Sequence, residues 1–366
     1  MLGHIKPEAE RQVGLILSVA GVIGVSADGL LVKLARADGA SAAATVVFKY
    51  ASGSAGMVLI LLVLWGLDLR GYSGATPFIT RPSRLGMWYL GAGAVLMLLV
   101  ELCYTLGFNF TTSANVLAFS SLAPIWAALL SWPVLGRKVP VRTALASVTA
   151  LAGSLVVGFG IGLGGGIGGA GRTGTESALG LACAIGTGIF LGAFVTLVES
   201  AAVRAPDAQM LFANLAGYLA AMAAGFALVP VLHDGSPSVA PDVARAVLWL
   251  CLNGVLCTAL SIATLTIAGR LLPATEISLL VQVESVLGPL STFAFLGEVP
   301  SPYTLGGGAA IVVAVATHEA LALREDIRAA SARRRERESS TAAPAPAAGR
   351  ERVAGVAVDK SAPAPV

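Results

Sequence analysis

Ten long apolar runs dominate the chain, and they constrain its fold more than any other feature. A helix that crosses the hydrocarbon core of a bilayer needs about 20 mostly apolar residues. Because lipid offers no water to the backbone, each run is expected to be a helix that satisfies its own hydrogen bonds. The runs extend approximately from Val13 to Ala35, Ala43 to Gly66, Leu85 to Gly107, Ala114 to Leu135, Thr143 to Leu163, Ala178 to Val198, Met210 to Leu232, Ala246 to Ala268, Thr275 to Leu296 and Tyr303 to Ala320.

The charge content agrees with a membrane protein. Only 12% of the 366 residues are charged and 56% are hydrophobic, whereas about a quarter of a soluble domain is charged. Nine of the 24 Lys and Arg residues follow residue 323, so the net charge of +3 belongs mostly to the tail. This basic stretch is short and interleaved with acids, which favours contact with a membrane surface over nucleic acid.

The distribution of Lys and Arg over the connections predicts the orientation. With the N-terminus in the cytoplasm, ten of these residues fall on the cytoplasmic side and three on the outer side, so both termini are predicted to be cytoplasmic. The ten are Lys6, Arg11, Arg70, Arg81, Arg84, Arg137, Lys138, Arg142, Arg204 and Arg270, and the three are Arg36, Arg172 and Arg245.

A Gly-rich segment divides the chain into two halves. The segment GFGIGLGGGIGGAGRTG contains a GxGxxG pattern but neither a preceding strand nor a suitable acidic residue, so it predicts a flexible external linker rather than a nucleotide site. From Ser339 onward the Ala/Pro/Ser-rich composition predicts disorder. The predicted organisation is a cytoplasmic N-terminus at 1–12, a first half at 13–163, the linker at 164–177, a second half at 178–322 and a basic, then disordered, cytoplasmic tail at 323–366.

The two halves are related by an internal repeat. A shift of 161 residues brings SWPVLGRKVPVRT near residue 138 onto TFAFLGEVPSPYT near residue 298, and pairs Gly93 with Gly254 and Gly136 with Gly297. A shift of 166 lays Gly14 on Gly180 and extends the relation to the first helices. Each half therefore contains five spans.

An odd number of spans inverts the second copy relative to the first. Inverted repeats are typical of secondary transporters, in which the substrate site lies near the bilayer midplane and opens alternately to each side. The sequence therefore predicts an all-α membrane protein with ten transmembrane helices in two inverted five-helix repeats.

The same residues resemble a known family. The stretch from YTLGFNFTTSANVLAFSSLAPIWAALLSWPVLGRK onward, and its partner LPATEISLLVQVESVLGPLSTFAFLGE, are similar to the two EamA-type halves of the drug/metabolite transporter superfamily over about residues 12–322. The resemblance implies an inner-membrane carrier, commonly an exporter of amino acids or other small metabolites. Arg137 departs from the LGE pattern. Ser285 stands where the family often has Pro, and Pro289 could replace its helix-bending role.

Ionisable residues inside the predicted spans are the candidates for function. A charge at the bilayer centre costs about 2.5 kcal/mol or more, so such residues face protein or water. Asp28 and Lys49 fit either a structural ion pair or a transport role, and Glu101 favours a transport role. Lys33 has the further option of reaching the membrane surface with its long side chain.

Glu284 is the best candidate for a residue that lines a central cavity. It follows Gln282 and precedes Ser285, and Ser278, Gln282 and Ser285 have the helical spacing that places them on one face. The predicted substrate or ion pathway is therefore Glu284, Glu101, Lys49, Asp28, Gln282 and Ser285. Glu298, His318 and Glu319 are instead expected at the membrane surface, at helix ends.

The remaining motifs exclude several classes of function. The four cysteines lack metal-type spacing, and no nucleophile with its base, metal cluster or phosphate loop is present, so we expect neither an enzyme nor a cofactor. The expected partners are a small-molecule substrate, the lipid bilayer and a coupling proton or ion. Small-residue stripes in the seventh and tenth runs could serve packing within the bundle or a homodimer interface. The alternative function is a membrane receptor or structural partner that keeps the carrier fold without transport.

Overall fold

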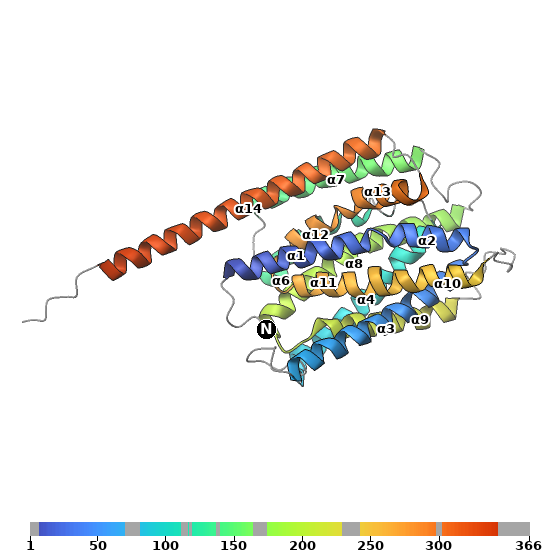
Figure 1. Cartoon of the computed structure of the whole chain (residues 1–366), viewed down its shortest axis with the longest axis horizontal. Helices are drawn as coiled ribbons and strands as arrows, with labels where there is room; N and C mark the ends of the chain where they lie inside the picture. Colours follow the sequence, from blue (N-terminus) through green and yellow to red (C-terminus); the bar gives the residue numbers. More distant parts are fainter. Residues whose placement is uncertain are drawn as a thin grey trace, which may run out of the picture. The chain divides into compact units, whose positions relative to one another are not determined.

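The structure is a computed structural model, and it describes residues 7–69, 81–110, 116, 119–136, 140–163, 174–228, 242–297 and 302–342. All regular secondary structure in these ranges is helical, as expected (Figure 1). The chain divides into two units, Met1–Ala320 and Leu321–Val366. The helices are α1 (Pro7–Val25), α2 (Asp28–Ala37), α3 (Ala42–Leu69), α4 (Arg84–Phe110), α6 (Ala123–Leu135), α7 (Val141–Leu163), α8 (Gly174–Arg204), α9 (Met210–Leu228), α10 (Val243–Leu252), η1 (Asn253–Ser261), α11 (Ile262–Ala268), α12 (Ala274–Val281), α13 (Glu284–Leu296) and α14 (Pro302–Ala342).

Within the described residues, 7 helical segments are long and apolar enough to cross a membrane. Three further apolar helices are shorter, at Ala123–Leu135, Val141–Val156 and Leu305–His318. These ten segments fall on the ten apolar runs of the sequence. The chain is a multi-pass membrane protein, and the ten-span layout remains a prediction.

The first and last predicted spans differ from their expected form. The first run is divided into α1 and α2 at Ser26 and Ala27, where the Ser26 hydroxyl donates to the carbonyl of Val22 at 2.6 Å. At the other end, α14 continues to Ala342, past the predicted end at Ala320. The His318 side chain faces the helix bundle, because it is only 2% exposed and its Nε2 lies 3.0 Å from the Thr143 hydroxyl, and its depth in the membrane stays a prediction.

Two helix breaks lie 161 residues apart, at the same displacement as the sequence repeat. One turn, at Ser121 and Leu122, precedes α6, and the other, at Gln282 and Val283, separates α12 from α13. Helices α6 and α13 each have 13 residues and each end at a left-handed glycine, Gly136 with φ 68° and Gly297 with φ 70°. Each glycine N–H donates to the carbonyl four residues earlier. The two halves therefore share local structure as well as sequence at this point.

The eighth apolar run contains a π-helix. Helices α10, η1 and α11 form one rod in Figure 1, beside the rod of α1 and α2. π-helical turns are rare and often occur at functional sites. In η1, Gly254 lies so close to α3 that an added Cβ would come within 2.2 Å of the Lys49 carbonyl oxygen. Only a residue without a side chain permits this approach.

Helices of the first half pack mainly on helices of the second half. Helix α4 packs along α8 and α9, while α3 packs along η1 and α9, and α1 with α2 pack along α11, η1 and α10. In the first half, the third predicted span is α4, and it lies against the first and second spans of the second half. In the second half, the third predicted span is α10–η1–α11, and it lies against the first and second spans of the first half. This reciprocal packing is the pattern that an inverted repeat produces, and it supports the proposed two-repeat layout.

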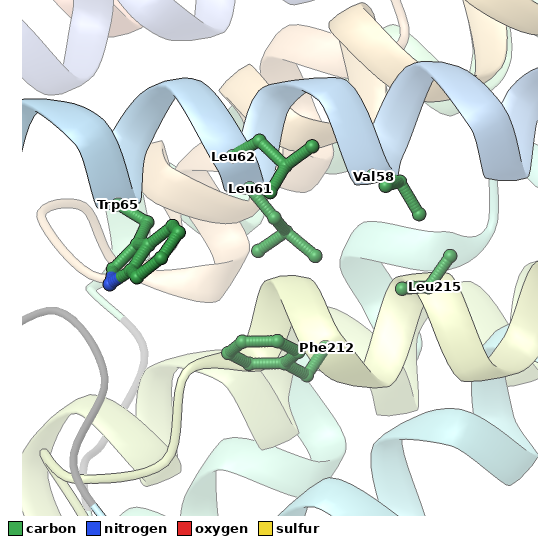
Figure 2. A pocket seen from close by; sticks show the side chains of 6 residues that line it. All are labelled: Val58, Leu61, Leu62, Trp65, Phe212 and Leu215. Carbon is green, nitrogen blue, oxygen red and sulfur yellow. The ribbon is translucent and has the colours of Figure 1, made fainter.

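A shallow apolar groove lies between α3 and α9 (Figure 2). Its volume is about 220 Å³, and its lining residues are Val58, Leu61, Leu62, Trp65, Phe212 and Leu215. No charged side chain lines the groove, and both helices are candidate membrane spans. We do not place the substrate pathway here, because the buried charged residues lie elsewhere.

Candidate substrate pathway

A buried ion pair joins α2 to α3. The Lys49 ammonium nitrogen lies 2.8 Å from Oδ2 of Asp28, and the two side chains are only 4% and 6% exposed. Asn253, the first residue of η1, donates its side-chain amide to the Asp28 carbonyl at 3.1 Å and to Asp28 Oδ1. Asp28 is also the first residue of α2, directly after the break from α1. The pair therefore sits where an interrupted helix meets a π-helix.

Glu101 lies beside this pair, on α4. The Tyr50 hydroxyl donates to Glu101 Oε2 at 2.9 Å and lies 2.6 Å from the Thr105 hydroxyl. Because Tyr50 directly follows Lys49, the same turn of α3 contacts both Asp28 and Glu101. Behind it, the Tyr218 ring on α9 stacks on the Tyr50 ring with centroids 6.3 Å apart.

Glu284 is connected to these residues by a hydrogen bond from a tyrosine. The Tyr104 hydroxyl on α4 donates to Glu284 Oε1 at 2.7 Å. The Lys49 ammonium lies 5.6 Å from the ring centroids of both Tyr50 and Tyr104, within the range of a cation–π interaction. Asp28, Lys49, Glu101 and Glu284 are thus linked by a continuous set of contacts, which we call the central cluster. Its members are Asp28, Lys49, Tyr50, Glu101, Tyr104, Asn253 and Glu284.

Gln282 and Ser285 lie at the break before α13, not among the carboxylates. The Gln282 side chain donates to the Ser121 carbonyl at 3.0 Å and so joins the two helix breaks directly. Ser285 is buried, and Ser278 donates its hydroxyl to the Ala274 carbonyl. In the described part of the chain, no hydrogen bond connects Gln282 or Ser285 to a carboxylate of the central cluster. Their role in the pathway remains a prediction.

The comparisons with known proteins identify the first half. Residues 12–159 match the model of the EamA-like transporter family. This match covers less than half of the chain, and we refer to residues 12–159 as the EamA-like region because of this similarity. The family belongs to the drug/metabolite transporter superfamily. No curated protein matches the chain. One solved structure, titled only "Crystal structure of protein", aligns with a TM-score of 0.60 at 19% identity over 85% of this chain and 98% of the other, and shows the fold alone.

The EamA-like region supplies most of the central cluster. Asp28, Lys49 and Glu101 lie within the matched residues, whereas Asn253 and Glu284 come from the second half. The cluster is therefore completed only where the two halves meet. In transporters built from inverted repeats, the substrate site lies at this junction, beside interrupted helices.

Sequence reasoning missed the residues that connect the charges. Tyr50, Tyr104 and Asn253 were not among the predicted site residues, although the spacing of Tyr104 three residues after Glu101 places both on one face of α4. A tyrosine hydroxyl or an amide inside an apolar run needs a hydrogen-bond partner when buried. Polar side chains inside apolar runs are therefore the sequence signal that could have identified these three residues.

Other acidic residues lie at helix ends and accept hydrogen bonds from neighbouring segments. Asp38, after α2, accepts hydrogen bonds from Arg245 Nε at 2.7 Å and from Trp249 Nε1 at 3.0 Å, both on α10. The Arg245 guanidinium holds the pKa of Asp38 below its usual value. Asp207, before α9, accepts from the Ser83 backbone N–H at the start of α4, and this bond lowers the pKa of Asp207. These contacts tie the first segment of each half to the third segment of the other.

The described residues contain no group of three His, Cys, Asp or Glu side chains arranged as metal ligands. The carboxylates of the central cluster instead contact tyrosine, lysine and amide groups. All four cysteines are free.

Proposed function

We propose that the protein is a secondary transporter that exports a small organic metabolite, such as an amino acid or a related solute, across the inner membrane by alternating access. The EamA-like region supports a membrane transporter of the drug/metabolite type. Export and the class of substrate are inferences from the resemblance to EamA-type halves, and alternating access is an inference from the repeat.

The central cluster carries the proposal. It places ionisable side chains from both halves together, beside the break before α2, the break before α13 and the π-helix η1. Charged groups in a bilayer are costly, and they are retained where they line a path for substrate or ions. Helix interruptions provide backbone groups and movable ends at the same place. Such a site can bind a polar solute away from lipid. A gradient rather than ATP would supply the energy, since the sequence has no phosphate loop.

Glu284→Gln tests the proposal directly. The amide keeps the size of the side chain and can still accept from Tyr104, so the variant should insert and fold. A hydrogen bond to a charged group contributes about 1.5–3 kcal/mol, so solute flux should fall about 10- to 100-fold. The measurement is metabolite efflux from cells with and without the protein, followed by flux in proteoliposomes at equal protein abundance.

The matched control is Glu325→Gln, which removes an exposed carboxylate on α14. Its flux should equal that of the unmodified protein. Unchanged flux for Glu284→Gln would remove Glu284 from the transport site. No flux of any metabolite, with or without the substitution, would favour a receptor or structural partner that keeps the carrier fold.

The predicted orientation of the chain in the membrane can be tested separately. The charge count predicts that the Gly-rich linker is outside and the tail inside, and the two fusion sites chosen to test this, Ala170 and Ala345, lie outside the described residues. Reporter fusions at Ala170 and Ala345 should therefore report opposite sides of the membrane. Reports from the same side would rule out the ten-span layout with cytoplasmic termini.

A further inference from the structure

We infer that the central cluster binds a solute that carries protonated amines and no net negative charge, with Glu101 and Glu284 as the groups that hold an ammonium. This inference rests on the proposed function, since it names the class of solute that the transporter carries. Three independent properties of the cluster support it: its charge balance, its free hydrogen-bonding capacity and its aromatic faces.

The charge balance is negative. Asp28, Glu101 and Glu284 supply three carboxylates, and Lys49 supplies the one ammonium. Lys49 is 2.8 Å from Asp28, so this pair neutralises itself. In the described residues, the hydrogen bonds to the carboxylates of Glu101 and Glu284 come from tyrosine hydroxyls, and a hydroxyl donor brings no positive charge. Negative charge without a counter-charge is costly in a bilayer. A cationic solute would relieve this cost, and an anionic solute would increase it.

Outside the Lys49 ammonium, the free hydrogen-bonding capacity of the described cluster consists of acceptors. Asn253 is fully buried and uses its amide nitrogen on Asp28, but its Oδ1 has no partner. Glu101 and Glu284 each accept from one tyrosine through one carboxylate oxygen. An ammonium has three donors and no acceptor, while an ionised carboxylate has only acceptors. In the described residues, the free acceptors of the cluster therefore complement an amine, whereas the ammonium that could donate to a carboxylate, Lys49, is already paired with Asp28.

The ammonium group of Lys49 already lies against two aromatic rings of the cluster. The Lys49 nitrogen lies 5.6 Å from the ring centroids of both Tyr50 and Tyr104. A cation within about 6 Å of a ring centroid is attracted by the ring, and more strongly when it is desolvated. Lys49 is a tethered alkylammonium, so its position shows that this part of the cluster accommodates the chemical group that we propose for the solute.

The positive side chains near helix ends do not offer an anion site in the cluster. Arg245 is bonded to Asp38, and Arg270 is bonded to Gln209 and to the Pro206 carbonyl. In the described residues, the cluster itself has Lys49 as its cation, and Lys49 is paired. A solute with a carboxylate would have to compete with Asp28 for Lys49 to obtain a counter-charge within the cluster.

Three solutes with the same five-carbon chain test the inference. Cadaverine has two amines, 5-aminopentanoate has one amine and one carboxylate, and glutarate has two carboxylates. We expect the purified protein to bind cadaverine at least 10-fold more tightly than 5-aminopentanoate, and glutarate not at all, measured by titration calorimetry. Glu101→Gln and Glu284→Gln should each weaken cadaverine binding about 10-fold or more. Glu325→Gln should bind cadaverine normally.

The comparison of the three solutes uses the unmodified protein, so it remains decisive if a variant does not fold. Equal affinity for all three, or preference for glutarate, would overturn the inference. Counterflow in proteoliposomes then separates it from the proposed function. Cadaverine binding without flux of any solute supports the amine site and contradicts transport. Flux of glutarate but not cadaverine supports transport and contradicts the amine site.

Discussion

Asp28→Asn should lower the free energy of unfolding by about 3–5 kcal/mol, because it removes one partner of a buried ion pair and leaves the Lys49 charge uncompensated. The Asp28 and Lys49 side chains are 6% and 4% exposed, so water cannot replace the lost partner. The asparagine can still accept from Asn253, and the change therefore isolates the charge. The measurement is thermal unfolding of the purified protein in detergent, with the folded yield from the membrane as a second readout.

The paired variant Asp28→Asn/Lys49→Gln is the control for this prediction. It replaces both charges with amides, so it should recover most of the lost stability, since a neutral pair no longer carries an uncompensated charge. It should not recover flux if the charges act in transport. A single variant that is as stable as the unmodified protein would show that Lys49 finds another partner.

Gly254→Ala should lower the stability by a smaller amount, through sterics alone. An added Cβ would lie 2.0 Å from the Ser52 hydroxyl oxygen, 2.2 Å from the Lys49 carbonyl oxygen and 2.7 Å from the Gly53 nitrogen. Two of these atoms are backbone, so η1 and α3 must separate. Overpacking typically costs 1–3 kcal/mol. Because Asn253 and Lys49 lie on the two separating segments, the contacts of Asp28 should be disturbed, and we expect solute flux to fall at least 10-fold.

The matched control is Gly91→Ala, on α4, where an added Cβ meets nothing within 4 Å. Alanine is favoured over glycine inside a helix by about 0.5–1 kcal/mol, so this variant should be as stable as the unmodified protein or slightly more so. Stability and flux can be compared at equal abundance in the same preparation. Equal behaviour of Gly254→Ala and Gly91→Ala would contradict the close approach of η1 to α3.

The helices follow from the sequence because lipid leaves the backbone few choices. Long apolar runs predicted helices, and the positions of the described helices agree with the ten runs. Their interruptions were not predicted. Ser26 and Ala27 carry no helix-breaking side chain, and the start of η1 at Asn253 has no proline. Two of these interruptions meet at the hydrogen bond from Asn253 to Asp28, which joins segments more than 200 residues apart in the sequence.

The candidate site was predictable as a set of residues but not as an arrangement. The cost of charge in lipid singles out Asp28, Lys49, Glu101 and Glu284 one by one. Their neighbours depend on how each helix is rotated about its axis, and a single sequence does not fix that rotation. The contact of Glu284 with Tyr104 spans 180 positions and two halves of the chain. Gln282 shows that closeness in the sequence does not predict which partner a side chain contacts. It is close in sequence to Glu284, and yet it bonds to the Ser121 carbonyl.

The π-helix η1 holds more residues per turn than an ordinary helix, so a change between the two kinds of winding would alter the register of the residues on either side of it. The equivalent stretch of the first half, 161 residues earlier, is ordinary α-helix within α4. Each residue of an α-helix turns the chain by about 100°. A π-helical turn that lost one residue and became α-helical would therefore rotate the helix before it by about 100° relative to the helix after it. Asn253 lies at one end of η1 and Ile262 begins α11 just after it. A one-residue change of winding there would turn the Asn253 amide away from Asp28 without unfolding any helix.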